Sequence, residues 1–347
     1  MKTILIMAGG TGGHIFPALA VAGEMKASGF EVVWLGTKGG MESKLVPAHG
    51  YEIEYVKMSG VRKSGLSRWA LLPATLLVAC LQALAVLRKR KPDVVLGMGG
   101  FASFPGAVAA FLLGRPLVIH EQNAIAGLSN RVISKFAKRT LVAFPDAIAG
   151  ATFVGNPVRK EIAALPGSCR EGRLKLLVMG GSRGARAIND AMPKAMAMIE
   201  ERLRPEVLHQ SGEADCERVK AAYADSGCAA EVVPFISDVA RAYAECDLVL
   251  GRSGALTVAE IAAAGLPSIL VPYPHAVDDH QSANARYLSD AGAAWLVPQN
   301  ELDPEKIAGM ITKLDRERLQ EMGRKARRLA VIDATEKVGR ICRELAA

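Results

Sequence analysis

The chain has 347 residues, of which half are hydrophobic and 22% are charged, so it is a folded protein of about two domains and not a disordered chain. Its net charge is +8, and its six cysteines include no C-x-x-C pair, which argues against a disulfide framework or a zinc site and suits a reducing cytosol. The short apolar start runs into glycines and does not resemble a secretory signal peptide.

The first half of the chain alternates predicted strands with predicted helices. Residues 2–10, "KTILIMAGG", form an apolar run that ends in glycine, and residues 14–29 predict a helix with Pro17 in its first turn. Further strands are expected at 30–40, 51–58, 93–100, 115–123 and 139–144, with helical stretches between most of them. This alternation predicts an α/β fold with a doubly wound parallel sheet.

Residues 56–92 carry eight Lys or Arg residues and no Asp or Glu, around an uncharged stretch at 69–87. That stretch is near the length of a membrane span, but it joins two predicted strands, where a crossover helix is needed. We therefore predict reversible contact with a membrane surface, with plain buried packing as the main alternative and a spanning helix as the least favoured one. The contact residues are expected to be Arg62, Lys63, Arg68, Trp69, Leu72 and Leu76. No reader motif points to nucleic acid.

The second half repeats the pattern of the first. Residues 174–199, "LKLLVMGGSRGARAINDAMPKAMAMI", again read as strand, glycine-rich turn and helix, and strands are expected at 205–212, 230–235, 247–254, 267–273 and 293–298. The repeat predicts two Rossmann-like domains, 1–158 and 159–329, divided near Asn156-Pro157. Residues 330–347 predict one more helix, and no strand follows it.

Four strand-to-helix junctions are rich in glycine: 9–13, 97–100, 180–184 and 251–254. Glycine allows a ligand to approach the backbone closely, and a helix N-terminus attracts phosphate, so the junctions predict a phosphate-bearing ligand between the two domains. A nicotinamide enzyme is disfavoured because the strand at 30–40 has no acidic residue at its end. A P-loop nucleotidase is excluded because the chain has no G-x-x-x-x-G-K-[ST] sequence.

The segment 251–265, "GRSGALTVAEIAAAG", predicts an almost wholly apolar helix with one polar stripe. Ser253, Thr257 and Glu260 are spaced by four and three residues and share a face of that helix. Glu260 could accept hydrogen bonds from ribose hydroxyls while the helix start faces a diphosphate. The alternative is that Glu260 is a surface residue of an alanine-rich helix.

Seven segments, in order along the chain, resemble the MurG family of bacterial glycosyltransferases: "GGTGGHIFPALAVA", "VLGMGGFASFPG", "HEQNAIAGLSNR", "VGNPVR", "GGSRGAR", "RSGALTVAEIAAAGLP" and "DDHQSANA". The resemblance implies the two-domain GT-B fold, with the last helix crossing back to the first domain. It implies inverting transfer of N-acetylglucosamine from UDP-N-acetylglucosamine to the muramyl 4-hydroxyl of lipid I, giving lipid II. Because that acceptor is a membrane lipid, the resemblance also implies peripheral contact with the anionic cytoplasmic face of the inner membrane. No cofactor is expected, and cell-wall synthesis proteins are possible partners.

The resemblance assigns a donor site to Thr11, Gly12, Gly13, Asn123, Arg159, Ser182, Ile236, Ala255, Leu256, Thr257, Val258, Ala259, Glu260 and Gln281. Glu260 would hold the uridine ribose, and the backbone of Ile236 would read the uracil edge. Ser182 and the first turn of the 255–260 helix would hold the diphosphate, and the amides Gln281 and Asn123 would read sugar hydroxyls. Phe101 and Phe104 depart from the Tyr and Gly of many family members.

His14 is the candidate general base, because a helix N-terminus disfavours imidazolium and keeps the ring neutral. A role in capping the loop or binding the acceptor is the alternative, and His120 or Glu121 could serve instead. Asp278 or Asp279 is expected to cap the following helix, so no metal is predicted. Two rival functions remain: a UDP-N-acetylglucosamine 2-epimerase and a nucleotide-binding module without activity.

Overall fold

The computed structural model describes residues 1–58, 66–167, 172–181 and 184–347, without the side chains of 66–71. The chain divides into two compact units, each of which is described by itself below. Unit 1 comprises Met1–Arg159 and Ile332–Ala347, and unit 2 comprises Lys160–Val331. These bounds differ from the predicted boundaries, 158/159 and 329/330, at Arg159, Ala330 and Val331.

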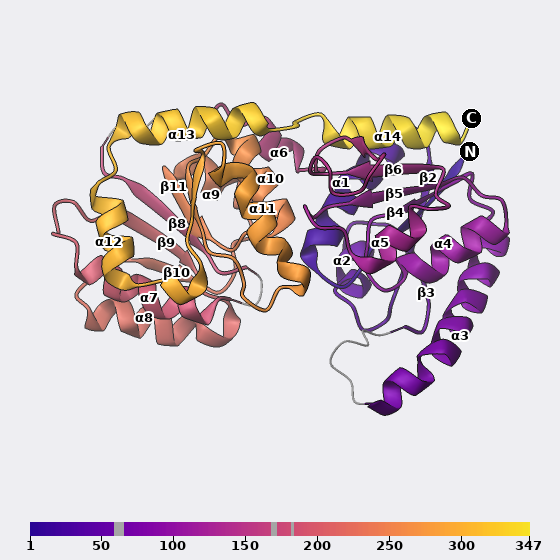
Figure 1. Cartoon of the computed structure of the whole chain (residues 1–347), viewed down its shortest axis with the longest axis horizontal. Helices are drawn as coiled ribbons and strands as arrows, with labels where there is room; N and C mark the ends of the chain where they lie inside the picture. The colour runs from indigo at the N-terminus through magenta and orange to yellow at the C-terminus, as the bar shows by residue number, and fades with distance from the viewer. Residues whose placement is uncertain (59–65, 168–171, 182–183) are drawn as a thin grey trace. The chain divides into compact units, whose positions relative to one another are not determined.

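Unit 1 is built on a parallel seven-stranded sheet of order β3-β2-β1-β4-β5-β6-β7 (Figure 1). Its strands are β1 Thr3–Met7, β2 Glu31–Gly36, β3 Glu52–Tyr55, β4 Val94–Gly97, β5 Leu117–Glu121, β6 Arg139–Val142 and β7 Thr152–Phe153. Its helices are α1 Gly12–Ala27, α2 Glu42–Ala48, α3 Leu66–Arg90, α4 Ser103–Leu112, α5 Leu128–Ile133 and α14 Ala334–Leu345. Only the two-residue strand β7 was absent from the sequence prediction.

Both faces of the centre of this sheet are buried, which explains why β1 and β4 are apolar runs. Ile4 and Ile6 of β1 face the core under α1 and α14, whereas Leu5 and Met7 face the core under α3 and α4. Helix α14 packs on α1, and Arg343 forms a 3.1 Å ion pair with Glu24. The C-terminal helix is therefore part of the core of unit 1.

Unit 2 has a parallel six-stranded sheet of order β10-β9-β8-β11-β12-β13. Its strands are β8 Lys175–Met179, β9 Glu206–Gln210, β10 Glu231–Val233, β11 Leu248–Gly251, β12 Ser268–Leu270 and β13 Ala294–Leu296. Its helices are α6 Lys160–Ala163, α7 Arg186–Ala197, α8 Cys216–Asp225, α9 Val239–Glu245, α10 Ala255–Ala264, α11 His280–Ser289, α12 Pro304–Thr312 and α13 Arg316–Leu329. Short 3₁₀ turns are η1 Glu213–Asp215, η2 Val277–Asp279 and η3 Gln299–Glu301.

The two sheets share one topology. In unit 1 the chain order reverses between β1 and β4, and in unit 2 it reverses between β8 and β11. Ligands of such sheets bind at the carboxyl ends of the strands beside this switch point. The shared strand order confirms the predicted fold of two Rossmann-like units. The four glycine-rich junctions follow these four strands, so glycines line the switch point of each unit.

Candidate functional site

The switch point of unit 1 brings two glycine loops into backbone contact. The Gly9 N–H donates to the Gly99 carbonyl over 3.2 Å. A Cβ on Gly100 would lie 2.5 Å from the Gly9 carbonyl oxygen, and the φ values of Gly99 and Gly100 are +92° and +91°. A side chain at either position would strain the backbone or separate the loops. These two glycines therefore hold the first turn of α1 against the end of β4.

His14 lies in that first turn of α1 and is half-buried. Its ring rests against Gly99, where an added Cβ would come within 2.7 Å of Nδ1. Nδ1 lies 2.9 Å from Oε1 of Gln122, which follows β5. The ring is thus held at the positive end of a helix and beside the ends of β4 and β5, as a candidate general base at this edge should be.

The alternative bases at the end of β5 are committed to other contacts. The buried Glu121 carboxylate accepts hydrogen bonds from Asn123 N, Gly127 N and Asn130 Nδ2 at 2.8–3.1 Å. His120 is fully buried, and both of its ring nitrogens have hydrogen-bond partners. Glu121 therefore shapes the turn that carries Asn123, and neither residue presents a basic atom to a ligand.

Glu42 is a buried carboxylate of unit 1 that the sequence analysis missed. It accepts hydrogen bonds from Gly10 N at 3.0 Å, Thr37 N at 3.0 Å and the Thr37 hydroxyl at 2.7 Å. Its negative charge occupies the turn after β1, where a dinucleotide enzyme would place pyrophosphate. This contact strengthens the case against a nicotinamide cofactor. The only sequence signal was an acidic residue at the start of the helix that follows β2.

In unit 2, helix α10 follows β11 at the switch point and begins after Gly254 without a side-chain cap. Its first turn contains no acidic residue, so its free N–H groups and helix dipole favour an anion. A Cβ on Gly251 would lie 2.7 Å from the Met179 carbonyl oxygen, which explains glycine at the end of β11. The second glycine loop, after β8, contains Ser182, which lies outside the described residues.

The polar stripe of α10 has two different environments. The Ser253 hydroxyl donates to the Gln281 carbonyl over 2.8 Å, and Asn284 Nδ2 donates to the Ser253 carbonyl over 3.2 Å, so Ser253 joins α10 to α11. Glu260 is only 3% exposed, and the Tyr243 hydroxyl lies 3.5 Å from its Oε2. The interpretation of Glu260 as a surface residue is therefore wrong: its carboxylate is buried in unit 2.

Arg252, at the start of the same stretch, is bound to the protein itself. Its guanidinium donates to the carbonyls of Val271 and Pro272 at 3.1 and 3.0 Å and stacks over the Tyr273 ring. Burial lowers the pKa of Arg252 from its usual value. These contacts join β11 to the segment after β12, so Arg252 stabilises the base of the α10 loop.

The remaining assigned residues lie at the following places. Gln281 lies in the first turn of α11, and its Oε1 accepts from Tyr273 N over 2.9 Å. Ile236 is 8% exposed in the loop before α9, next to the exposed Phe235. Arg159 stacks over the Phe16 ring of α1, within unit 1. Thr11 is exposed and Gly12, Gly13 and Asn123 are half-buried; on α10, Leu256, Thr257 and Ala259 are half-buried, and Ala255 and Val258 are buried.

Asp279 occupies the N-cap position of α11, but its side chain does not cap the backbone. It accepts from the Ser282 hydroxyl over 2.7 Å, and Asp278 and Asp279 both have positive φ. Asp279 therefore stands at the N-cap position, but the predicted side-chain cap is absent. Within the described ranges, no three His, Cys, Asp or Glu side chains lie close enough together to share a metal ion.

A 420 Å³ cavity of unit 2 lies away from the glycine loops. Lys175, Glu206 and Glu231, at the amino ends of β8, β9 and β10, belong to its lining. Substrates of parallel α/β sheets bind at the opposite, carboxyl ends of the strands. We therefore assign the candidate site to the loop edge and not to this cavity.

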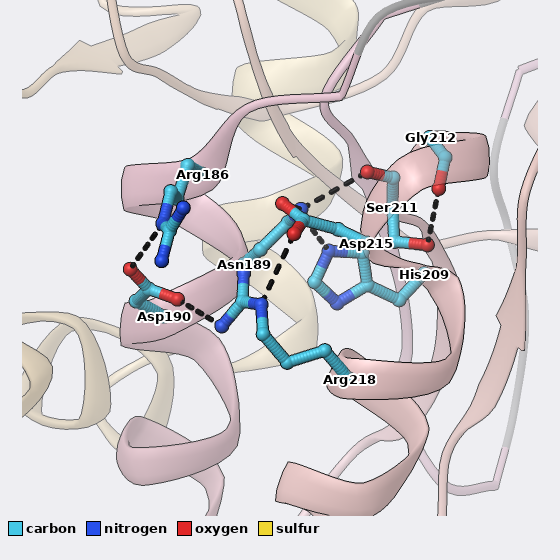
Figure 2. Close-up of polar contacts among 8 residues, drawn as sticks. All are labelled: Arg186, Asn189, Asp190, His209, Ser211, Gly212, Asp215 and Arg218. Carbon is cyan, nitrogen blue, oxygen red and sulfur yellow. Dashed lines mark hydrogen bonds and ion pairs between the residues drawn. The ribbon is translucent and has the colours of Figure 1, made fainter.

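A polar network whose centre, Asn189 and His209, is buried supports the loop edge of unit 2 (Figure 2). Asn189 on α7 donates to the Ser211 carbonyl at 3.0 Å and to Asp215 at 2.9 Å, and its Oδ1 lies 3.1 Å from His209 Nε2. Arg218 pairs with Asp215 and Asp190 at the exposed side of the network. Because Gly184 packs directly on the Ser211 carbonyl, these contacts fix the two loops relative to each other.

The network makes His209 a pH-sensitive stability element. Burial lowers the pKa of His209 to about 4, below the value of about 6.5 in an unfolded chain. As the pH falls, the unfolded state therefore binds a proton at His209 before the folded state does. The neutral His209 contributes its full stabilisation above about pH 6.5, and this contribution is lost as the pH falls toward 4. We expect wild type to lose about 2 kcal/mol more unfolding free energy between pH 7 and pH 5 than His209→Gln.

Urea unfolding at the two pH values, monitored by circular dichroism, measures this difference. His49→Gln is the matched control, because His49 is exposed and should leave the pH dependence unchanged. Equal losses in wild type and His209→Gln would contradict the assignment.

Comparisons with known proteins agree with this geometry. Residues 4–142 match the model of the glycosyltransferase family 28 N-terminal domain, and residues 175–338 match that of the family 28 C-terminal domain. The chain is 54% identical to the UDP-N-acetylglucosamine--N-acetylmuramyl-(pentapeptide) pyrophosphoryl-undecaprenol N-acetylglucosamine transferase of Aromatoleum aromaticum, over 100% of this chain and 99% of that one. It is 53% identical to the enzyme of the same name from Azoarcus sp., with the same coverage.

Solved structures give the same result. The crystal structure of Acinetobacter baumannii MurG superposes with a TM-score of 0.86 at 39% identity, covering 99% of this chain and 100% of that one. The glycosyltransferase VinC, solved in complex with dTDP, has a TM-score of 0.69 at 16% identity, which supports the fold alone.

Proposed function

The chain belongs to glycosyltransferase family 28, and from this premise we propose that it transfers N-acetylglucosamine from UDP-N-acetylglucosamine to the muramyl 4-hydroxyl of lipid I, forming lipid II with inversion at the anomeric carbon. The observation that carries the proposal is identity above 50% over the whole chain to enzymes whose names state this transfer. The similarity gives no support to a 2-epimerase.

The donor binds mainly to unit 2. The diphosphate faces the uncapped start of α10, where the N–H groups of Leu256 and Thr257 are free of intrahelical partners. Glu260, two turns into the same helix, accepts hydrogen bonds from the ribose hydroxyls. Gln281 reads the sugar through Nε2, because its Oε1 is already bonded to Tyr273 N. The Ile236 backbone reads the uracil edge, and Ser182 contributes from the second loop.

The chemical step requires a base for the attacking hydroxyl and stabilisation of the leaving UDP. His14 takes the proton of the muramyl hydroxyl as the oxygen attacks the anomeric carbon from the face opposite UDP. The diphosphate gains negative charge as its bond to the sugar breaks, and the helix N-terminus stabilises that charge. Thr11, Gly12, Gly13 and Asn123 lie at the loop edge of unit 1, and we propose that they contact the substrates there.

A radiolabelled-donor assay tests the proposal. Labelled UDP-N-acetylglucosamine and a lipid I analogue should give label in the lipid product. Formation of the manno isomer without acceptor would instead identify a 2-epimerase. Tight UDP binding without turnover would identify a nucleotide-binding module.

The lipid acceptor reaches the enzyme through an apolar surface of unit 1. Its exposed side chains are Leu77, Val78 and Leu81 on α3, Phe111 and Leu112 on α4, and Leu128 on α5. Helix α4 contacts both α3 and α5, so these side chains lie on adjoining elements. The exposed Arg131, Lys135 and Lys138 follow on α5 and just after it. An apolar surface fringed by cations suits an anionic membrane.

This surface differs in part from the sequence prediction. Leu72 and Leu76 are half-buried, Arg62 and Lys63 lie outside the described residues, and the contributions of α4 and α5 were missed. Residues 72–90 of α3 have the length and hydropathy of a membrane span, with 22% of that window buried. Ala79, Ala83 and Leu87 form the buried stripe, which packs α3 into unit 1 as the crossover from β3 to β4. Peripheral contact is therefore favoured over spanning.

Vesicle co-sedimentation measures the contact. Replacing Leu81 and Phe111 with Glu should weaken binding to anionic vesicles by about 10-fold or more, because each exposed side chain contributes roughly 1.5–3 kcal/mol when fully buried. Met198→Glu with Leu203→Glu is the matched control, since both residues are exposed on unit 2. High salt should weaken wild-type binding. Unchanged binding of the α3–α4 variant would exclude this surface as the contact.

A further inference from the structure

Four groups of unit 1 form one hydrogen-bond chain behind the candidate base. The His14 Nδ1 lies 2.9 Å from Gln122 Oε1, Gln122 Nε2 lies 3.1 Å from His120 Nδ1, and His120 Nε2 lies 2.9 Å from the Gly155 carbonyl oxygen. His120 and Gln122 are fully or almost fully buried, whereas His14 is half-buried and ends the chain at the candidate site. The chain thus joins α1, β5 and the segment after β7.

The Gly155 carbonyl sets the direction of every bond in this chain. A carbonyl oxygen only accepts, so His120 must carry its proton on Nε2. Burial lowers the pKa of His120 to about 4, so at neutral pH its Nδ1 is a bare acceptor. Gln122 must then donate to it through Nε2, which leaves Oε1 toward His14. The amide cannot be turned round without placing its oxygen against the bare Nδ1 of His120.

We propose that the Gly155–His120–Gln122 chain fixes the tautomer of His14, placing the proton on Nδ1 and leaving the Nε2 lone pair for the substrate. Gln122 Oε1 accepts the Nδ1 proton, so the neutral ring has one free basic atom. Within the described part of the chain, Nε2 makes no hydrogen bond. His120 and Gln122 act through His14 and are positioning residues.

The tautomer of His14 follows from the hydrogen bonds alone, and only its role in catalysis rests on the proposed function. A general base must present an unprotonated atom, and a ring held in the wrong tautomer would present an N–H to the attacking hydroxyl. The hydrogen-bond chain therefore keeps every neutral His14 ring in the tautomer that can accept a proton on Nε2. It also holds the ring plane against Gly99, which limits rotation about the side-chain bonds.

Nitrogen-15 NMR of the full-length protein labelled at histidine tests the tautomer without any substrate. At pH 8, His14 should show a protonated Nδ1 and an unprotonated Nε2, and its signals are identified by their loss in His14→Asn. A protonated Nε2 in the wild-type ring would overturn the proposal. This result is independent of turnover, so the proposed function can fail in the transfer assay while the tautomer stands, and the converse also holds.

Gln122→Met keeps the approximate size of the side chain and removes both hydrogen bonds. Its His14 signals should shift to a mixture of the two tautomers. Its kcat should fall by about 10-fold to 100-fold, the cost of losing the partner that orients a metal-bound histidine, with donor KM unchanged. Asn130→Leu is the matched control, because Asn130 is buried nearby, binds Glu121 and is not part of the chain. It should leave the His14 tautomer unchanged.

An unchanged His14 tautomer in Gln122→Met would contradict the proposal. So would Asn130→Leu if it showed both the same fall in kcat and the same change in the His14 signals as Gln122→Met. If Gln122→Met does not fold, the wild-type spectrum still decides which nitrogen of His14 carries the proton.

Discussion

Replacing His14 with Ala is expected to lower kcat by about 10²–10⁴-fold, the usual contribution of a general base, while the donor KM changes little. The reason is geometric: His14 lies in unit 1, against Gly99 and Gln122, whereas α10 and Glu260 belong to unit 2. Loss of the imidazole therefore removes the proton acceptor and leaves the nucleotide contacts of unit 2 in place. Steady-state kinetics with a lipid I analogue and varied donor measure the two constants separately.

His14→Gln and His49→Ala are the informative companions. His14→Gln retains a hydrogen-bonding side chain in the first turn of α1 but has no basic nitrogen, so it should be as inactive as His14→Ala. His49→Ala changes an exposed histidine whose Nδ1 bonds to Leu45, and it should retain wild-type kcat. If His14→Ala instead kept its turnover at saturation and lost affinity for the acceptor, His14 would be a binding residue.

Replacing Glu260 with Ala is expected to raise the donor KM by about 10- to 100-fold, because hydrogen bonds to an ionised group contribute roughly 1.5–3 kcal/mol. Glu260 is almost fully buried, and its Oε2 lies at 3.5 Å from the Tyr243 hydroxyl. In the proposed binding mode the ribose hydroxyls of the donor donate to this carboxylate, so Glu260→Ala removes those hydrogen bonds. The same variant should lose discrimination between UDP-N-acetylglucosamine and its 2′-deoxyribose analogue.

Tyr243→Phe distinguishes the contact of Glu260 with the donor ribose from its contact with the Tyr243 hydroxyl. It removes the hydroxyl near Glu260 and keeps the carboxylate, so donor KM should change much less than in Glu260→Ala. Thermal unfolding of both variants reports any loss of packing around α10. Wild-type donor affinity in Glu260→Ala, or unchanged discrimination against the deoxy analogue, would refute the ribose assignment.

The two switch points use one topology with different electrostatics. In unit 1 the Gly10 N–H is occupied by the Glu42 carboxylate, which places a negative charge at the turn after β1. In unit 2 the start of α10 has neither a side-chain cap nor an acidic residue in its first turn. An anionic diphosphate is therefore favoured at α10. Fold alone does not make this distinction, because both sheets have the same strand order.

The sequence by itself determined the fold class and the location of the loops. Alternating apolar runs and amphipathic stretches are local patterns, and glycine at the end of β1, β4, β8 or β11 marks a tight turn without reference to distant residues. The internal repeat then made two Rossmann-like units the expected solution. The strand order in the structure agrees with that expectation.

Only the tertiary structure decided which polar side chains are free to meet a ligand. Glu121 was an alternative base in the sequence, yet its carboxylate binds the turn after β5. Arg252 precedes the predicted helix start, yet its guanidinium binds the carbonyls after β12. Glu42 reaches Gly10 across 32 positions, and His14 reaches Gln122 across 108. Such partners depend on which strand ends are neighbours in a sheet, and no local pattern of residues encodes that pairing.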